Sequence, residues 1–379
     1  MIQNQFLKNT IYERNFLLGF IVLTALLIRY SFHNFGLPFT HDDFGYFVFA
    51  LDISILDNFP NYLISSIGWP IFVSIFFQIF SFENLISYMI LQENLSIWLS
   101  ALTAIPIFFL SKKFISKKFA FFPAFLFVIE PRIVLNSVQG LTEPLFLILF
   151  TSALVLVLSK SVKLSYVAFV FASFSAIVRP EGLIIILLIC MLFFYNHKSQ
   201  KINFIKFLPN IVIIFAIMSP IMIYQMEIHD EELFFSRILD GTNQLITGTG
   251  EAEDIVDGKL VPYEFDVNII HGLQNFFKYG LWVLLPLFFL VPLGLFSVLK
   301  RWNYDTLVIF TSLTIISLPV LYVYSNFIES VRFLLIFYPL FSIITTIGFI
   351  FIFSKLGFNN KFVIIVALIF LIMSIVFLS

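Results

Sequence analysis

Apolar runs of about 17 to 25 residues recur along the whole chain, and they constrain its fold more than any other feature. Each run is long enough to cross the roughly 30 Å hydrocarbon layer of a bilayer as an α-helix. In lipid, only helices and closed barrels satisfy every backbone amide, and these runs lack the alternating apolar and polar residues of barrel strands. The sequence therefore predicts an all-α polytopic membrane protein.

Composition excludes a soluble domain and several kinds of partner. Of the 379 residues, 60% are hydrophobic and only 12% are charged, whereas a soluble domain carries roughly a quarter charged residues. The single cysteine, Cys190, cannot form an intrachain disulfide. The sequence contains no P-loop and no nucleic-acid-binding motif, so we expect membrane lipids and no nucleic acid among the partners.

The apolar runs predict about eleven transmembrane helices. We expect them at 16–32, 87–110, 119–135, 143–158, 164–178, 182–195, 207–226, 277–299, 305–323, 332–353 and 362–379. The stretch 69–80 is too short to cross a bilayer, so we interpret it as an interfacial helix that follows a first outer loop at 33–66. The segment 227–276 is rich in acids and glycines, which is typical of a partly ordered outer loop.

The basic residues orient the chain, because lysine and arginine near span ends stay on the cytoplasmic side. If the N-terminus is cytoplasmic, all but seven of the 22 Lys and Arg residues fall in inner segments; the seven are Arg29, Arg132, Arg179, Arg237, Lys259, Lys278 and Arg332. We therefore predict a multi-pass protein of the cell membrane, with residues 16–32 as a retained signal anchor and the active site on the outer face.

Polar residues gather at the outer ends of the predicted spans. They are His41, Asp42, Asp43, Tyr46, Glu130, Arg132, Asn136, Glu143, Arg179, Glu181, Glu329 and Arg332. Several lie in proline-containing turns, namely IEPR at 129–132, TEPL at 142–145 and RPEG at 179–182. Because ionisable groups beside a bilayer are costly, such a set favours a functional site over loop residues of no consequence.

Carboxylates and arginines together suit transfer from a lipid-phosphate donor at the membrane surface. A carboxylate can take the proton from an attacking hydroxyl, while arginines hold and neutralise the departing phosphate through paired hydrogen bonds. A positively charged pocket between helices suits a polyprenyl phosphate, whose tail stays in lipid. Aromatic residues such as Tyr46, Trp69, Tyr263 and Tyr338 could stack on a sugar.

Five short motifs carry a resemblance to a known family. They are HDDFGY at 41–46, GWP at 68–70, TEPL at 142–145, RPEG at 179–182 and VRFLLIFYP at 331–339. In their order and their shared face they resemble GT-C fold glycosyltransferases that use polyprenyl- or dolichyl-phosphate sugars, related to protein O-mannosyltransferases and the lipid A aminoarabinose transferase. The resemblance implies a GT-C-like catalytic module over 1–226, an outer acidic loop over 227–276 and C-terminal transmembrane helices over 277–379.

The resemblance also implies roles for individual residues. The base of an inverting displacement would be Asp42, with Asp43 as its neighbour or substitute, and Glu143 would orient the acceptor or the donor. Arg179, Arg332 and Arg132 would bind the donor phosphate. The remaining substrate-binding candidates are His41, Tyr46, Trp69, Glu181 and Glu329. No cofactor is required, although His41 beside the acid pair leaves room for a divalent cation.

Two departures from the family and two rival functions stay open. The chain has only Pro70 and no adjacent lysine at the start of the interfacial helix, and it lacks the WWD-type signature of oligosaccharyltransferases, which disfavours transfer of a preassembled oligosaccharide to asparagine. A transporter or flippase of lipid-linked glycans would use the same acids and arginines for translocation, and a non-catalytic membrane scaffold would leave them far apart. The sugar, the acceptor (lipid, glycan or protein), the polyprenyl length and the oligomeric state are open.

Overall fold

The computed structural model describes residues 2–33, 41–56, 59–62, 64, 66–197, 204–229, 233–256, 259–283, 290–300 and 302–356. Its helices run in the order α1 (Ile2–Phe32), α2 (His41–Ile55), α3 (Gly68–Ile79), α4 (Leu85–Leu102), α5 (Ala104–Phe114), α6 (Phe122–Ile129), α7 (Pro131–Ser137), α8 (Glu143–Val157), α9 (Val162–Val178), α10 (Gly182–His197), α11 (Phe204–His229) and α12 (Leu233–Thr247). The antiparallel hairpin β1 (Thr249–Val256) and β2 (Lys259–Asp266) follows, then α13 (Ile269–Val283), α14 (Leu290–Leu299), α15 (Tyr304–Ser325), the 3-10 helix η2 (Val331–Phe337) and α16 (Tyr338–Leu356).

Membrane-spanning helices are confirmed. Five described segments are long and apolar enough to cross a bilayer: Arg14–Phe32, Leu85–Phe114, Ile205–Ile228, Tyr304–Ser325 and Val331–Phe353. Along α1, large apolar side chains point outward, as expected of a lipid-facing helix; Phe16 is 69% exposed and Leu27 is 64% exposed. The chain is therefore a multi-pass membrane protein. The predicted count of eleven stays a prediction, and the predicted span 362–379 lies outside the described residues.

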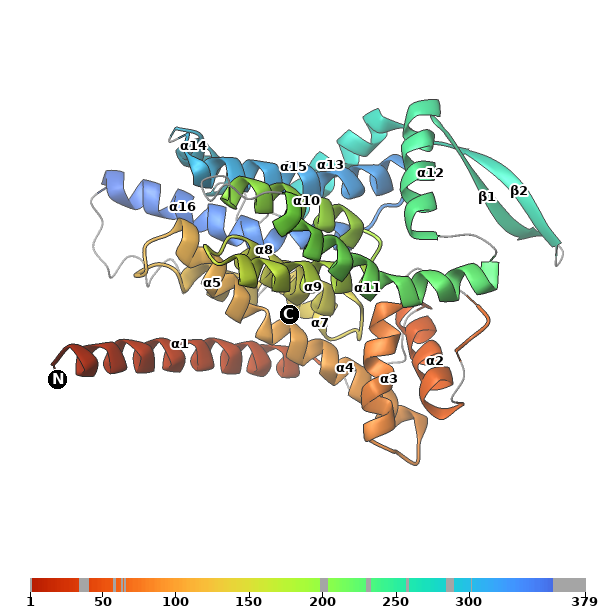
Figure 1. Cartoon of the computed structure of the whole chain (residues 1–379), viewed down its shortest axis with the longest axis horizontal. Helices are drawn as coiled ribbons and strands as arrows, with labels where there is room; N and C mark the ends of the chain where they lie inside the picture. The colour runs from red at the N-terminus through yellow and green to blue at the C-terminus, as the bar shows by residue number, and fades with distance from the viewer. Residues whose placement is uncertain are drawn as a thin grey trace.

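The long helices pack side by side into an elongated bundle, with α8 on α9, α9 on α10 and α11, and α14 on α16 (Figure 1). Fully buried aromatic side chains fill the space between them, including Phe127, Phe150, Phe169 and Phe193. The short helices α2 and α3 pack against each other at one end of the bundle, and α12 and the hairpin lie at the same end (Figure 1). The turns that carry the candidate site residues open at this end.

The structure revises the predicted elements in three places. The interfacial helix is present as α3, and the predicted first outer loop also contains a helix, α2. The predicted span 119–135 is broken at Glu130, because Pro131 restrains the preceding residue to an extended backbone. The described part of the segment 227–276 carries secondary structure, namely the end of α11, α12, the hairpin and the start of α13, and residue 277 lies within α13.

Candidate active site

The RPEG turn sets the position of Arg179 and Glu181. Pro180 holds Arg179 in an extended conformation, which ends α9, and the Arg179 N–H donates to the Ser175 carbonyl. Gly182 then starts α10 so close to α9 that a Cβ there would lie 2.4 Å from backbone atoms of Ser175. A glycine is required at this close approach, and the tight turn places both charged side chains at the end of the bundle.

The TEPL turn places Glu143 at the first residue of α8, with Pro144 directly after it. The loop before it is tied down at Gly140, whose carbonyl accepts hydrogen bonds from the Trp69 indole at 2.8 Å and from Gln92 at 3.0 Å. Trp69 is fully buried. Its ring therefore packs in the core and fastens the loop before α8, and we correct its predicted role as a sugar-stacking residue to a structural one.

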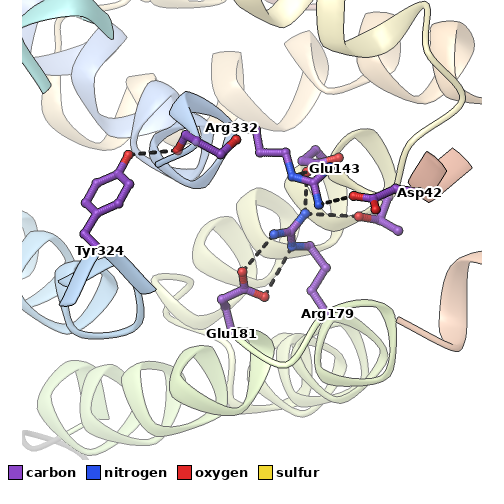
Figure 2. A network of polar contacts seen from close by, with 8 residues as sticks. Asp42, Glu143, Arg179, Glu181, Tyr324 and Arg332 are labelled. Carbon is purple, nitrogen blue, oxygen red and sulfur yellow. Dashed lines mark hydrogen bonds and ion pairs between the residues drawn. The ribbon is translucent and has the colours of Figure 1, made fainter. Parts of the chain in front are cut away.

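A strained turn between α15 and η2 presents Arg332. Phe327 adopts φ +58°, a conformation that side-chain-bearing residues rarely adopt. The buried Tyr324 hydroxyl donates to the Ser330 carbonyl at 3.0 Å, and His271 of α13 stacks on the Phe327 ring at 4.1 Å. These contacts hold the start of η2, so that Arg332 points back toward α8 and α2 (Figure 2).

Arg179 lies between two carboxylates (Figure 2). Its Nε and Nη2 donate to the two oxygens of Glu181 at 3.2 and 2.8 Å, while Nη1 donates to Glu143 Oε1 at 2.5 Å and to the Thr142 hydroxyl at 3.1 Å. The guanidinium also lies over the rings of Phe146 and Phe333, at 5.8 and 5.7 Å. Paired hydrogen bonds and aromatic faces on a buried cation fix its orientation.

Arg332 joins the acid of the first outer loop to this network (Figure 2). Its Nη2 lies 2.6 Å from Asp42 Oδ2, and its Nε lies 3.5 Å from Glu143 Oε1. Both partners of the first pair are accessible, with 31% of the Arg332 side chain and 47% of the Asp42 side chain exposed. The second oxygen of Glu143 is buried and has no hydrogen-bond partner among the described residues.

A small pocket with a cavity volume of about 10 Å³ opens beside this network. Its charged end is formed by Glu143, Arg179, Glu181 and Arg332. Its apolar wall comes from α8, α15 and η2 and consists of Phe146, Leu147, Pro319, Val320, Phe333, Leu335 and Ile336. A ligand in this pocket would therefore need a polar, charged part and an apolar part.

The electrostatics of the network favour the charged forms of its central pair. Burial is the largest single effect and by itself would lower the pKa of Arg179 and raise that of Glu181, but the charges and hydrogen bonds within the network, including those of Glu143, together outweigh it. As a result the pKa of Arg179 is raised and that of Glu181 is lowered from their ordinary values. Tyr46 also faces the network, and burial raises the pKa of its phenol, which stays neutral.

Other predicted site residues lie apart from this network. Arg132 interacts with Glu130 and Tyr338, whose hydroxyl donates to Glu130 Oε1 at 2.8 Å. Glu329 accepts a hydrogen bond from the Tyr279 hydroxyl at 2.6 Å and lies near Lys278 and His271. The structure therefore gives Arg132 and Glu329 other partners than Arg179 and Arg332. The backbone of His41 begins α2, but its side chain lies outside the described part of the chain.

The two aspartates of the first outer loop occupy different surroundings. Asp43 is 2% exposed, and its carbonyl accepts a hydrogen bond from Gln92 at 3.2 Å. Glu93 interacts electrostatically with Asp43 and bonds His33 at 2.8 Å. Sequence reasoning missed this buried cluster, although Gln92 and Glu93 are polar residues within an apolar run and could have signalled it. Of the two aspartates, only Asp42 contacts an arginine of the pocket.

The described residues contain no group of three or more His, Cys, Asp or Glu side chains arranged to hold a metal ion. The carboxylates beside the pocket are instead engaged by guanidinium groups. The arrangement can bind an anion and can offer a carboxylate as a base. A divalent cation is compatible with the acids present.

Known proteins resemble this chain in structure and not in sequence. No protein-family model matches the sequence, and no curated protein sequence matches it either. Among solved structures, ArnT from Cupriavidus metallidurans bound to undecaprenyl phosphate is similar with a TM-score of 0.61 and 11% identity, covering 87% of this chain and 60% of ArnT. The Archaeoglobus fulgidus oligosaccharyltransferase complex with Zn and sulfate has a TM-score of 0.58 and 14% identity, covering 93% of this chain and 52% of that protein.

Both similar proteins are GT-C fold glycosyltransferases. The chain has the GT-C fold. A third similar structure is the oligosaccharyltransferase AglB from Archaeoglobus fulgidus in complex with an inhibitory peptide and a dolichol-phosphate. Its TM-score is 0.56 at 11% identity, covering 94% of this chain and 54% of AglB. This chain therefore spans about half to three-fifths of the length of the similar structures. The fold predicted from the five motifs is thereby confirmed.

Proposed function

We propose that this protein transfers a sugar from a polyprenyl-phosphate-linked donor to a hydroxyl acceptor. One observation carries the proposal: a pocket with arginines and carboxylates at one end continues along an apolar wall between α8, α15 and η2. A lipid phosphate has the same division, with an anion at one end and a hydrocarbon chain beyond it. The similar structures support this choice, since ArnT binds undecaprenyl phosphate and AglB binds a dolichol-phosphate.

Arg332 is suited to the donor phosphate. Guanidinium groups bind phosphate oxygens through paired hydrogen bonds, and this one is partly exposed at the mouth of the pocket. The unpartnered Glu143 oxygen beside it can accept a hydrogen bond from a sugar hydroxyl. Together they would hold the reacting end of the donor while its tail remains against the apolar wall.

Asp42 is suited to the role of base. It is exposed and lies within the network, whereas Asp43 is buried against α4. In the proposed step, the acceptor O–H gives its proton to Asp42 as its oxygen attacks the anomeric carbon. The bond from this carbon to the phosphate oxygen breaks, and polyprenyl phosphate leaves with the electron pair. Attack from the face opposite the phosphate inverts the anomeric centre.

The proposed orientation places this chemistry on the outer face of the cell membrane, with a cytoplasmic N-terminus. Its support is the distribution of lysine and arginine, which are concentrated in the segments opposite the site. The acceptor is a hydroxyl of a lipid, a glycan or a protein, and the donor sugar is a hexose or a pentose.

The test is sugar transfer by purified protein from a radiolabelled mixture of polyprenyl-phosphate sugars to endogenous lipid and protein acceptors. We expect wild type to transfer label, and Asp42→Asn to lose at least about 100-fold of the rate, the usual contribution of a general base. Asp52→Asn is the matched control, because Asp52 lies on the same helix and its carboxylate bonds Tyr62 instead of the network. Parallel reactions with EDTA and with added divalent cations test the need for a metal.

Two results would contradict the proposal in different ways. If wild type and Asp42→Asn had equal transfer activity, Asp42 would not be the base, but the protein would still be a glycosyltransferase. No transfer by wild type from any donor, together with protein-dependent movement of lipid-linked glycan across a vesicle membrane, would identify a transporter.

A further inference from the structure

The two arginines of the site differ in how much of their hydrogen-bonding capacity is in use. Arg179 is 6% exposed and uses four of the five guanidinium N–H donors on Glu143, Glu181 and Thr142. Phe146 and Phe333 cover its faces. Most of its donors are therefore engaged in buried contacts, and freeing those that bind Glu143 or Glu181 for a phosphate would leave a carboxylate buried without its partner.

Arg332 is in the opposite situation. Its ion pair with Asp42 is accessible on both sides, and exposed pairs of this kind contribute little stability. No hydrogen-bond partner for its Nη1 group is recorded among the described residues. Glu143 Oε1, at 3.5 Å from Nε, would keep Arg332 at the pocket after Asp42 moved away. Asp42 is thus the exchangeable ligand of Arg332.

The observed contact conflicts with the geometry of an inverting displacement. The attacking hydroxyl must approach the anomeric carbon from the face opposite the leaving phosphate, and the base must lie beside that hydroxyl to take its proton. Asp42 cannot lie there while it is paired with the Arg332 Nη2 group that would bind the phosphate. The three carboxylates and two guanidiniums give the network a formal net charge of −1, so a phosphate that enters competes with the carboxylates for the two guanidiniums.

We propose that the donor phosphate displaces Asp42 from Arg332, so that binding of the donor releases the base. This inference rests on the proposed function and deepens it. Arg332 becomes the phosphate ligand, and Arg179 becomes a positioning residue that aligns Glu143 and Glu181 without touching the phosphate. The donor then binds before the acceptor is activated, and Asp42 is held away from reacting hydroxyls in the empty enzyme.

Binding of undecaprenyl phosphate to the purified full chain tests the displacement without knowledge of the acceptor. We expect Asp42→Asn to bind about two- to fivefold tighter than wild type, because the internal competitor is lost and an exposed ion pair is worth roughly that factor. Arg332→Gln should bind at least about tenfold more weakly. Asp52→Asn should match wild type. Equal or weaker binding by Asp42→Asn would overturn the inference.

Chemical labelling of carboxyl groups provides an independent test of whether the phosphate displaces Asp42 from Arg332. A water-soluble carbodiimide with an amine should label Asp42 more in the presence of undecaprenyl phosphate than in its absence, as read by peptide mass spectrometry. Asp52 serves as the internal reference, because its partner Tyr62 is outside the site. Unchanged or reduced labelling of Asp42 in the presence of undecaprenyl phosphate would contradict the proposed displacement.

Measurements of affinity and kcat distinguish the role of Arg179 from that of Arg332. Arg179→Lys keeps the charge and loses the paired hydrogen bonds. We expect its affinity for undecaprenyl phosphate to stay within about twofold of wild type, while kcat falls at least about tenfold because Glu143 is no longer aligned. A loss of affinity as large as that of Arg332→Gln would instead make Arg179 a phosphate ligand.

The failure of this inference can be told from the failure of the proposed function. If wild type binds undecaprenyl phosphate and the Asp42 variant gains nothing, only the displacement is overturned. If wild type binds neither undecaprenyl phosphate nor dolichyl phosphate, the lipid-phosphate donor is overturned with it. If inorganic phosphate competes at the same concentration as the lipid, the pocket recognises free phosphate, and the lipid donor is again overturned.

Discussion

Two buried arginines, Arg29 and Arg179, illustrate how differently this protein uses a charge within its bundle. Arg29 lies in α1, is fully buried, and donates to the Ser100 hydroxyl at 3.1 and 2.9 Å and to the carbonyls of Ala25 and Val128. Arg179 lies at the end of α9 and is balanced by the carboxylates of Glu143 and Glu181 beside a pocket. The first ties α1 to α4 and α6, whereas the second holds two carboxylates in place at the candidate site.

The difference in partners explains the difference in use. Hydroxyl and carbonyl groups satisfy the N–H donors of Arg29 but carry no charge that a substrate could compete with. The carboxylates around Arg179 hold a fixed negative field next to space that a ligand can enter. A buried arginine within a membrane bundle therefore indicates a site when its partners are acids beside a pocket.

The largest effect is expected from Arg179→Leu. Removal of the cation leaves Glu181 buried without its partner and leaves Glu143 with Arg332 at 3.5 Å, and breaking a buried pair in this way costs about 3–5 kcal/mol. Sugar transfer should disappear and the melting temperature of the detergent-solubilised protein should fall. A melting temperature equal to that of wild type would show that the two acids find other partners and that the pair is not central to the fold.

A smaller loss is expected from Arg29→Met, which leaves the Val128 carbonyl without its donor. An unsatisfied buried acceptor costs about 1–3 kcal/mol, and the release of a buried charge offsets part of that cost. Thermal stability should fall while the transfer rate per folded molecule stays at the wild-type value. Ser100→Ala is the matched control and should reproduce part of the loss in stability; a fall in the transfer rate of either variant would break the distinction between the two arginines.

Lowering the pH should reduce the stability that the ion pair between Arg179 and Glu181 contributes to the folded protein. Burial by itself would raise the pKa of Glu181, but the charge and hydrogen bonds of Arg179 together with other nearby donors and charges outweigh burial, so this pKa is lowered in the folded protein. Its contribution is therefore complete above the pKa of about 4.3 of an unfolded glutamate, and it is lost as the pH falls through the lowered value. The difference in melting temperature between wild type and Glu181→Gln should shrink below about pH 4. A constant difference down to pH 3 would contradict this assignment.

The smallest effect is expected from Tyr279→Phe. This change removes the hydrogen bond to Glu329, whose carboxylate is 45% exposed and lies with Lys278 and His271. Because exposed pairs contribute little, neither the melting temperature nor the transfer rate should change measurably. A fall in transfer without a fall in stability would return Glu329 to the substrate-binding residues, as the sequence predicted.

Patterns within short segments of the sequence were sufficient to predict the class of fold and the types of residue in the candidate site. The length of each apolar run is a property of a short segment, so spans and the short interfacial helix α3 could be recognised without any tertiary contact. The proline turns around Glu143 and Arg179 were equally readable, because Pro restrains its neighbour wherever it occurs. The helical bundle and the most important charged turns followed from these features.

Contacts between distant segments could not be obtained in this way. The pairing of Asp42 with Arg332 depends on how α2 and η2 come to lie beside the end of α8, and the burial of Trp69 and Asp43 depends on the same packing. Hydropathy and turn chemistry act over a few residues, whereas such pairing is decided by the close fit of whole helices. The sequence alone determined a membrane bundle with acids and arginines at one end; only the tertiary structure decided which acid meets which arginine.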